Sequence, residues 1–465
     1  MSTQCIIKQP ELKLGLKSLK LPNSSKTRKV FIDFKGGKTS SNGGAALLRE
    51  IEAICNILKR LSHCFHDYRD QSRVTHSVLS MLTQRIIAIC CGYEDINDHE
   101  ELRNDPVLQL CCERLNALAG KSTLNRLELS ANIVDRYKKI VADFMAIDKL
   151  LVRLFMESFR KEPKEIVLDI DITDDPLHGD QEGKFYHGYY RGYCYAPSYI
   201  FCGRHLLGCR LRVSNQDSAA GAKQEIERIV SQIRRKWKKT RIIIRGDSGF
   251  CRENLMKWCE DNRVDYVFGI ASNTRLKKIV QKEMKQAQED HSTTQEPARR
   301  FASFEYRTLD SWSRSRRVVC KAEHLSKGAN PRFIVTSLSS NLYNAKTMYE
   351  KMYCARGEME NRIKAQQLEL FADRTSTHYM PSNQLRMYLS AFAYIILEVL
   401  RREGLKGTRY EMAQCHTIRL MLLKIGTVVK MSMRRVRLSF PESYPHAELF
   451  SRALEKLQGM RTSYG

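Results

Sequence analysis

An extended run that places two carboxylates on one face most limits how this chain can fold. Residues 165–173 read Glu-Ile-Val-Leu-Asp-Ile-Asp-Ile-Thr, which predicts a β-strand with Asp169, Asp171 and Thr173 on the same side. A carboxylate in a central strand costs free energy unless a cation or hydrogen-bond donors receive it. The run therefore indicates a metal site. A solvated pair on an edge strand is the alternative.

A second carboxylate follows a short apolar run. Residues 241–250 read Arg-Ile-Ile-Ile-Arg-Gly-Asp-Ser-Gly-Phe, typical of a central strand that delivers Asp247 at its carboxyl end. Gly246 and Gly249 allow the backbone to approach a phosphate or a metal closely. An ordinary turn is one alternative. A serine nucleophile is another, but Gly-x-Ser-x-Gly is not present here and no matching His constellation supports it.

A third acidic residue lies on a predicted helix over residues 352–367. Tyr353, Arg356, Glu360 and Lys364 are spaced i, i+3, i+7 and i+11, so they share one polar, ionisable face. We interpret Glu360 as a metal ligand flanked by groups that hold phosphate. A surface helix with salt bridges is the alternative.

The spacing Tyr-(2)-Arg-(3)-Glu resembles the signature around the last acidic residue of DDE transposases from bacterial insertion sequences. The resemblance is to the subgroup with a Tyr-Arg-Glu-Lys motif. This chain has Gln367 where that motif has its lysine, and Lys364 lies one turn earlier. Residues 93–106 and 122–128 also resemble the N-terminal part of this family.

The resemblance implies a catalytic trio. The family's first carboxylate stands in an Asp-x-Thr setting, which Asp171-Ile172-Thr173 fits best, with Asp169 as runner-up and Asp174 behind it. Asp171, Asp247 and Glu360 would then be the catalytic metal ligands. They would hold Mg²⁺ or Mn²⁺, in a pair of ions, because hard divalent cations favour oxygen ligands. Tyr353, Arg356 and Lys364 would grip DNA phosphates.

The implied activity is cut-and-paste excision of an insertion sequence and its strand transfer into target DNA. The implied partner is double-stranded DNA, both terminal inverted repeats and target, and the implied assembly is a homodimer on paired ends. Two alternatives stay open: a catalytically inactive transposase-derived DNA-binding protein, and a related metal-dependent nuclease or resolvase.

The expected fold is α/β, a ribonuclease H-like core with a β-rich insertion, preceded by an all-α DNA-binding region. Extended runs at 185–192 and 206–213 are predicted to pair antiparallel with 165–173, followed by a helix, a strand, a helix and a strand up to residue 270. The predicted divisions are a basic flexible arm (1–45), a helical DNA-binding region and linker (46–160), the core (161–272 and 343–402), the insertion (273–342) and a basic C-terminal region (403–465).

Charge and composition agree with a polyanionic partner. Lys and Arg number 78 against 52 Asp and Glu, a net charge of +26, and phosphate contacts release counterions from DNA. No apolar run of about 18 residues exists, so no transmembrane helix is expected. The 15 cysteines lack the spacing of a disulfide framework, which indicates a cytoplasmic protein, here bacterial and nucleoid-associated.

Two further places are candidate DNA contacts. A helix that opens after Gly120 carries Lys121, Asn125 and Arg126, a pattern typical of helices that enter a major groove and also of buried helical hairpins. Trp312 lies among arginines within the predicted insertion. It would stack on a flipped base or pack the insertion's own core.

Overall fold

The structure, a computed structural model, describes residues 34–464 apart from 130–133 and 135–136. Before residue 34 it describes four two-residue strands: β1 (Leu12–Lys13) paired with β4 (Phe31–Ile32), and β2 (Leu19–Lys20) paired with β3 (Thr27–Arg28). Most of the predicted flexible arm therefore lies outside the described residues. Among those described, no helix is both long and apolar enough to cross a membrane.

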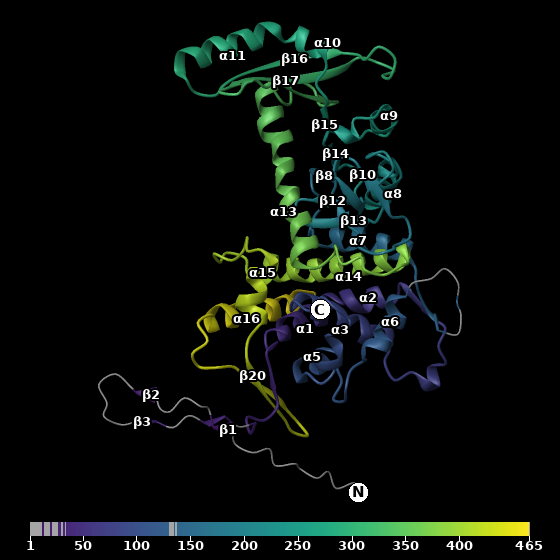
Figure 1. The fold of residues 1–465 in the computed structure, drawn as a ribbon, viewed down its shortest axis with the longest axis vertical. Coiled ribbons are helices and arrows are strands. Elements are labelled where there is room, and N and C mark those ends of the chain that lie inside the picture. The colour runs from purple at the N-terminus through teal and green to yellow at the C-terminus, as the bar shows by residue number, and fades with distance from the viewer. Residues whose placement is uncertain are drawn as a thin grey trace.

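A large mixed sheet forms the middle of the molecule (Figure 1), in the order β13-β12-β8-β14-β15-β19-β17-β16, with β18 paired to β17. Only the pairings of β14 with β8 and with β15 are parallel, and the others are antiparallel. The strands are β8 (Glu165–Ile172), β12 (Ser198–Cys202), β13 (His205–Arg210), β14 (Arg241–Gly246), β15 (Asp265–Ile270), β16 (Ala298–Tyr306), β17 (Arg316–Leu325), β18 (Gly328–Ala329) and β19 (Arg332–Thr336).

Apolar stripes attach the neighbouring helices to this sheet. In α8 (Ala222–Lys236), Ile226, Ile229, Val230 and Ile233 recur at helical spacing and are buried with the isoleucines of β14. Phe155 of α7 (Phe144–Glu157) and Met256 of α9 (Glu253–Asp261) belong to the same core. The helix, strand, helix and strand predicted after residue 213 are confirmed as α8, β14, α9 and β15.

Both predicted antiparallel pairings with β8 are wrong. Residues 185–192 do not pair with β8, because they fold back on themselves: β10 (Phe185–His187) pairs with β11 (Gly192–Tyr195). β11 in turn pairs with β9 (Asp175–Pro176) in a small separate sheet. The strand that pairs antiparallel with β8 is β12. The predicted run 206–213 does not pair with β8 either, because β13 pairs with β12.

The predicted insertion continues the central sheet. Its strands β19, β17 and β16 add to the edge beyond β15, and α10 (Thr274–Ile279) and α11 (Gln281–Thr294) lie at the same end of the molecule (Figure 1). Because these strands are hydrogen-bonded to β15 through β19, their position is fixed relative to the rest of the sheet.

One long helical segment runs from the β16–β17 end of the sheet toward α14 (Figure 1). It passes without a break through α12 (Ala345–Thr347), a π-helical stretch η3 (Met348–Tyr353), a 3₁₀ stretch η4 (Cys354–Gly357), α13 (Glu358–Lys364) and a second π-helical stretch η5 (Ala365–Glu369). π-helical turns inside helices occur frequently at functional sites.

A helical layer packs below the sheet, with α14 (Met380–Val399) between the two (Figure 1). α14 touches α3 on one side and β13 on the other, so nearly all of its surface is buried. The layer comprises α1 (Ala45–Cys55), α2 (Ile57–Ser62), α3 (Val78–Cys90), α4 (His99–Leu102), α5 (Pro106–Cys111), α6 (Lys121–Glu128), η6 (Leu400–Gly404), α15 (Cys415–Ile418), η7 (Arg419–Leu423) and α16 (Ala447–Tyr464).

Short strands complete the fold. β6 (Phe65–Asp67) pairs with β7 (Ile140–Ala142), and the hairpin of β20 (Thr427–Met431) and β21 (Val436–Ser439) pairs with β5 (Thr39–Ser40). Two 3₁₀ turns are η1 (Gln71–Arg73) and η2 (Ser248–Phe250).

Candidate functional site

The three predicted carboxylates line one cleft of about 830 Å³. Asp171 comes from the end of β8 and Asp247 directly follows β14, and because these two strands are parallel, both residues lie at the same edge of the sheet. Glu360 reaches the cleft from α13 and is exposed there. Three elements far apart in the sequence therefore contribute one acidic residue each.

Asp171 has a raised pKa. Burial, with the negative charges of Asp247 and Glu360, raises the pKa of Asp171 to about 6, and Arg356 opposes the rise. Arg356 Nη1 donates to Asp171 Oδ2 at 2.7 Å, and the backbone N–H of Ile172 donates to Asp171 Oδ1 at 3.0 Å. The predicted phosphate-binding arginine is thus held against the first carboxylate.

Asp247 is fixed by a tight turn. Its Oδ1 accepts a hydrogen bond of 2.8 Å from the backbone N–H of Gly249, at the start of η2. A side chain at Gly246 would place its Cβ 3.0 Å from the ring of Phe250 and 3.2 Å from Ile170, so the position before Asp247 has to be small. The glycines predicted to permit close approach therefore serve packing and turn geometry here.

The structure also separates Asp169 from Asp171. Asp169 is 1% exposed, and its two oxygens accept from Arg245 Nε at 2.5 Å and Nη2 at 2.8 Å. Arg245 Nη1 donates in addition to the carbonyl of Met352 at 2.5 Å, in the helical segment that carries Glu360. Asp169 is therefore held in a buried ion pair and does not line the cleft, whereas Asp171 does.

Tyr353 lies behind the cleft rather than in its wall. It is partly buried, burial raises its pKa, and it packs against β15 at Gly269. A Cβ at Gly269 would stand 2.7 Å from Tyr353 Oη and 2.9 Å from the backbone nitrogen of Ser248. Gly269 was not singled out from the sequence, because an isolated glycine within a strand does not reveal what approaches it.

Gln367, which stands where the family motif has lysine, joins two elements of the site. Its Nε2 donates to the carbonyl of Asp174 at 2.7 Å, and its Oε1 accepts from Thr173 Oγ1 at 3.2 Å. Lys364 is exposed and lines the cleft one turn earlier. Gln367 therefore links the chain after β8 to the helical segment of Glu360, and Lys364 adds a cation to the cleft in addition to Arg356.

The acidic trio fits a divalent cation by its chemistry, since all three side chains offer carboxylate oxygens. The negative charges of Asp247 and Glu360 both raise the pKa of Asp171. As placed, no three His, Cys, Asp or Glu side chains in the described ranges are grouped closely enough to hold a metal ion. Arg356 engages the Asp171 carboxylate that a cation would use.

The predicted DNA-reading residues lie elsewhere. Lys121, Asn125 and Arg126 are exposed on one side of α6, and none of them lines the carboxylate cleft. The helix begins at Lys121, directly after Gly120, whose backbone is in the extended conformation. These three side chains are available to a partner.

The base-stacking prediction for Trp312 is corrected. Trp312 is 4% exposed, lies edge-on to Tyr306 at 5.7 Å between ring centroids, and has the guanidinium of Arg316 5.5 Å from its ring. Arg316 in turn contacts Glu253 and Glu260 at 2.6 Å each. Trp312 is therefore buried, but in the core shared with α8, α9 and β14 and not in a separate core of the insertion. The neighbouring arginine pairs with carboxylates.

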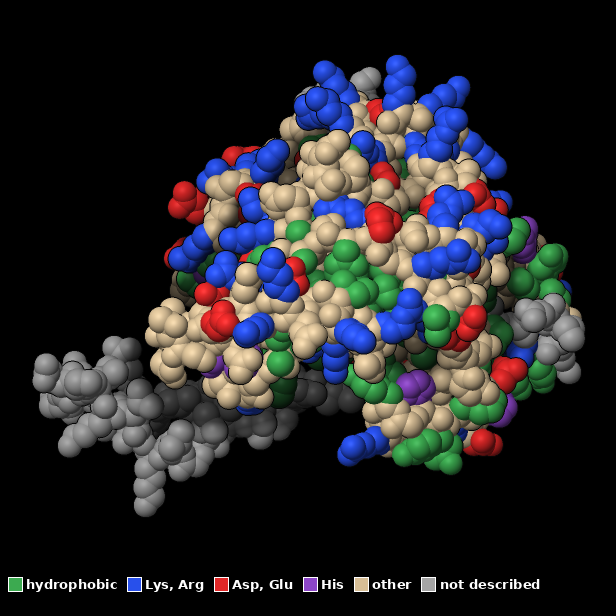
Figure 2. All heavy atoms as spheres, turned by 90° about the horizontal axis from the view of Figure 1, so that it is seen from above, with side chains coloured by type: hydrophobic (Ala, Val, Ile, Leu, Met, Phe, Trp, Pro, Cys, Tyr) green, Lys and Arg blue, Asp and Glu red, His purple; other side chains and the backbone are tan. Residues whose placement is uncertain are grey.

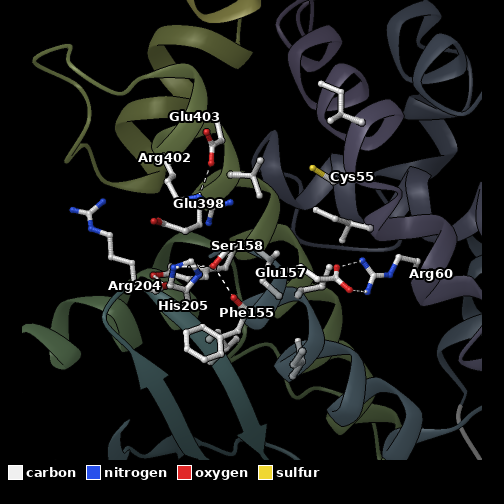
Figure 3. Close-up of a pocket in the computed structure, with 18 of the residues that line it drawn as sticks. Cys55, Arg60, Phe155, Glu157, Ser158, Arg204, His205, Glu398, Arg402 and Glu403 are labelled. Atoms are coloured by element: carbon white, nitrogen blue, oxygen red, sulfur yellow. Dashed lines mark hydrogen bonds and ion pairs between the residues drawn. The ribbon is translucent and has the colours of Figure 1, made fainter. Parts of the chain in front are cut away.

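A second cavity has a volume of about 200 Å³ (Figure 3). It is lined by α1, α2, α7, α14 and the start of β13, and it shares no lining residue with the carboxylate cleft. His205 lies against Ser158 there, and Glu157 pairs with Arg60 at 2.6 Å. Burial lowers the pKa of His205 to about 3, so its imidazole is neutral.

Basic side chains cover the end of the molecule that carries α10 and α11. Lys and Arg side chains spread across this face in Figure 2. The helices α10 and α11 carry the exposed Lys277, Lys278, Lys282 and Lys285. Such a face attracts a polyanion through long-range electrostatics.

The fold is mixed α/β with a large mixed sheet, and three acidic residues line one cleft. Residues 23–462 match the family model described as Transposase DDE domain group 1. The chain belongs to this family, which confirms the predicted class of DDE transposases and implies DNA transposition by a polynucleotidyl transferase.

Among solved structures, the chain is similar to the piggyBac transposase in a synaptic complex with hairpin DNA, determined by cryo-EM. It aligns with a TM-score of 0.41 and 10% sequence identity, over 82% of this chain and 80% of that chain. No curated protein sequence matches this chain.

Proposed function

We propose that this protein is the transposase of a bacterial insertion sequence, of the subgroup with the Tyr-Arg-Glu-Lys motif. In this proposal it excises the element at its terminal inverted repeats and joins the released ends to target DNA. The observation that carries the proposal is the convergence of Asp171, Asp247 and Glu360, from three separate elements, on one cleft.

The strand order supports a ribonuclease H-like core. On one side of β8, β12 pairs antiparallel with β8 and β13 pairs antiparallel with β12. On the other side, β14 pairs parallel with β8 and β15 pairs parallel with β14. This is the order expected of that fold for its first five strands, with the third acidic residue arriving on a later helix.

Asp171, Asp247 and Glu360 would hold Mg²⁺ or Mn²⁺, in a pair of ions, which would activate the attacking oxygen and stabilise the leaving oxygen at phosphorus. The protein's own contribution is to hold these carboxylates on rigid elements. Arg356 and Lys364 line the same cleft and supply positive charge for a phosphate. Tyr353 supports the turn of Asp247 from behind, as its contact with Gly269 indicates.

The proposed partner is double-stranded DNA, bound by a homodimer that brings two element ends together in the bacterial nucleoid. The net charge of +26 and the basic α10–α11 face support contact with phosphates. Lys121, Asn125 and Arg126 remain the proposed reading residues, because they are exposed on one helix.

The test is a joining assay. Purified protein is mixed with labelled duplex carrying the element's own end and with a supercoiled target plasmid, with Mg²⁺, with Mn²⁺ or with EDTA. We expect cleavage at the element's end and transfer of label to the plasmid, both dependent on the metal.

The rival functions give different outcomes in this assay. Cleavage without labelled plasmid would support the metal-dependent nuclease. Retarded mobility of the duplex without any cleavage, with either metal, would support the inactive DNA-binding protein and overturn the proposal.

A further inference from the structure

A hairpin rich in exposed tyrosines forms part of the carboxylate cleft. β10 and β11 and the loop between them read Phe-Tyr-His-Gly-Tyr-Tyr-Arg-Gly-Tyr over residues 185–193. Tyr189 is 84% exposed, Tyr186 58% and Tyr193 52%. Large aromatic side chains gathered on a surface in this way mark an interaction site, because the removal of their apolar surface from water lowers the free energy.

The loop of this hairpin faces the proposed chemistry. His187, Tyr189 and Tyr190 line the same cleft as Asp171, Asp247 and Glu360. The hairpin is held there by β9, whose Asp175 pairs with Tyr195 directly after the acidic end of β8. An aromatic ring in this place lies beside any DNA strand whose phosphate enters the cleft.

The neighbouring contacts orient Tyr189 without covering it. Its ring meets that of Tyr190 edge to face, 5.1 Å between centroids, and Tyr190 packs on His187 at 4.7 Å. Burial, followed by the charges of Asp174 and Asp171, raises the pKa of Tyr190 to about 12. Tyr190 therefore stays neutral beside the carboxylates, and its ring supports the ring of Tyr189.

Cations accompany the aromatic rings. Lys184 Nζ lies 4.8 Å above the ring of Tyr193, and Arg191 stands in the loop with a positive φ of 54°. Aromatic rings interleaved with Lys and Arg are typical of surfaces that bind single-stranded nucleic acid, since bases stack on the rings while cations meet the phosphates.

We propose that the hairpin of residues 185–195 binds an unpaired DNA base, which stacks on Tyr189 while its strand passes through the carboxylate cleft. This inference rests on the proposed function, because it supplies the DNA. A base inside a duplex has both faces covered by its neighbours, so an exposed ring beside the cleft gains only from a base that is unpaired or flipped out. Trp312 is buried and cannot take this role.

The experiment measures binding without cleavage, in EDTA. The probes are two duplexes of equal length that carry the element's end, one fully paired and one with a short single-stranded overhang containing 2-aminopurine. Wild type should bind the overhang duplex more tightly and quench its fluorescence. Tyr189→Ala should bind that duplex about tenfold more weakly and lose the quenching, since one base–aromatic stack contributes about that much.

Two variants separate stacking from damage to the hairpin. Tyr189→Phe retains the ring and should behave as wild type. Tyr186→Ala removes an exposed tyrosine of the same hairpin that does not line the cleft, and should retain the preference for the overhang. Equal binding of the overhang duplex by wild type and Tyr189→Ala, or an equal loss in Tyr186→Ala, would overturn the inference.

The outcome is independent of catalysis. If wild type prefers the overhang and Tyr189→Ala does not, the stacking site stands even where the joining assay shows no cleavage. If cleavage and joining occur but Tyr189→Ala quenches 2-aminopurine normally, the proposed function stands and the stacking site fails.

Discussion

Asp169 and Asp171 are two residues apart on one face of β8, yet Asp169 forms a buried ion pair and Asp171 lines the cleft. Asp169 faces Arg245, whose side chain is 9% exposed, and Asp171 faces Arg356, whose side chain is 21% exposed at the cleft. The cost of losing either carboxylate depends on how well water can reach the arginine left behind, because an uncompensated buried charge is strongly destabilising.

A matched pair of substitutions tests this difference. Asp169→Asn should lower the free energy of unfolding by about 3 kcal/mol, since Arg245 then keeps a buried charge without a counter-charge. Asp171→Asn should change it by less than about 1 kcal/mol, because Arg356 can be solvated and the fold disfavours the charged carboxylate. Urea unfolding of both variants measures the contrast, and equal losses would contradict it.

Asp175 gives the fold a pH dependence of its own. Burial, with the charges of Asp373 and Asp174, raises its pKa from 3.8 to about 8. Between these two values the folded protein keeps a proton that the unfolded chain has released. This contribution to stability is therefore complete below about pH 4 and is lost as the pH rises to about 8, by on the order of 1 kcal/mol per pH unit.

Asp175→Asn should remove that slope. The variant should melt at a higher temperature than wild type at pH 8, and the difference should shrink toward pH 4. Thermal unfolding across this range measures it. A wild type whose melting temperature follows that of Asp175→Asn at every pH would show that the buried carboxyl titrates normally.

At the scale of elements, the site depends on how the segment of Glu360 is fastened to the sheet. Arg245 of β14 bonds to the carbonyl of Met352, and Gln367 bonds to Thr173 and Asp174 after β8. Two polar links, one before and one after Glu360, thus set its distance from the other carboxylates. Misplacement of a reacting group by about 1 Å costs on the order of 100-fold in rate.

Gln367 is the link at which this sequence differs from the family motif, which has lysine there. Its role can be tested separately. Gln367→Ala should slow DNA cleavage by about 10- to 100-fold while DNA affinity stays the same, because the substitution loosens the geometry rather than the binding. Gln367→Lys should recover part of the rate, since an ammonium donates to the Asp174 carbonyl but cannot accept from Thr173. Cleavage by Gln367→Ala at the wild-type rate would remove this residue from the site.

Gly269 and Gly357 form a second matched pair. Gly269→Ala should slow cleavage, because its Cβ would stand 2.7 Å from Tyr353 Oη and 2.9 Å from Ser248 N, next to Asp247. At Gly357 a Cβ meets nothing within 4 Å, and alanine should stabilise the helix by up to about 1 kcal/mol. Cleavage rates and melting temperatures of both variants measure this, and similar rates for the two would contradict the account of Tyr353.

Across the whole molecule, local patterns in the sequence predicted where the helices and strands lie better than they predicted which of them pack or pair together. The period of apolar residues located β8, β14, β15 and α8, and it placed Asp171 on β8 and Asp247 at the carboxyl end of β14. These placements follow from the 2.0 and 3.6 residue periods of strands and helices.

What the sequence left open depends on contacts between distant residues. The choice between Asp169 and Asp171 is made by Arg245, 76 positions away, through the register of β14 on β8. The turn within residues 185–192, the continuation of the sheet into β19, β17 and β16, and the burial of Trp312 likewise depend on strand pairing and packing that no local period encodes.

The most direct test of the central claim is cleavage of a labelled duplex with the element's end by wild type, Asp171→Asn, Asp247→Asn and Glu360→Gln, with Mg²⁺ or Mn²⁺ and with DNA binding measured in parallel. The account predicts that wild type cleaves and that each variant binds DNA but does not cut, because each removes one carboxylate from a shared metal site. Normal cleavage by any of the three variants would contradict that site, and normal cleavage by Asp171→Asn would return Asp169 as the first ligand.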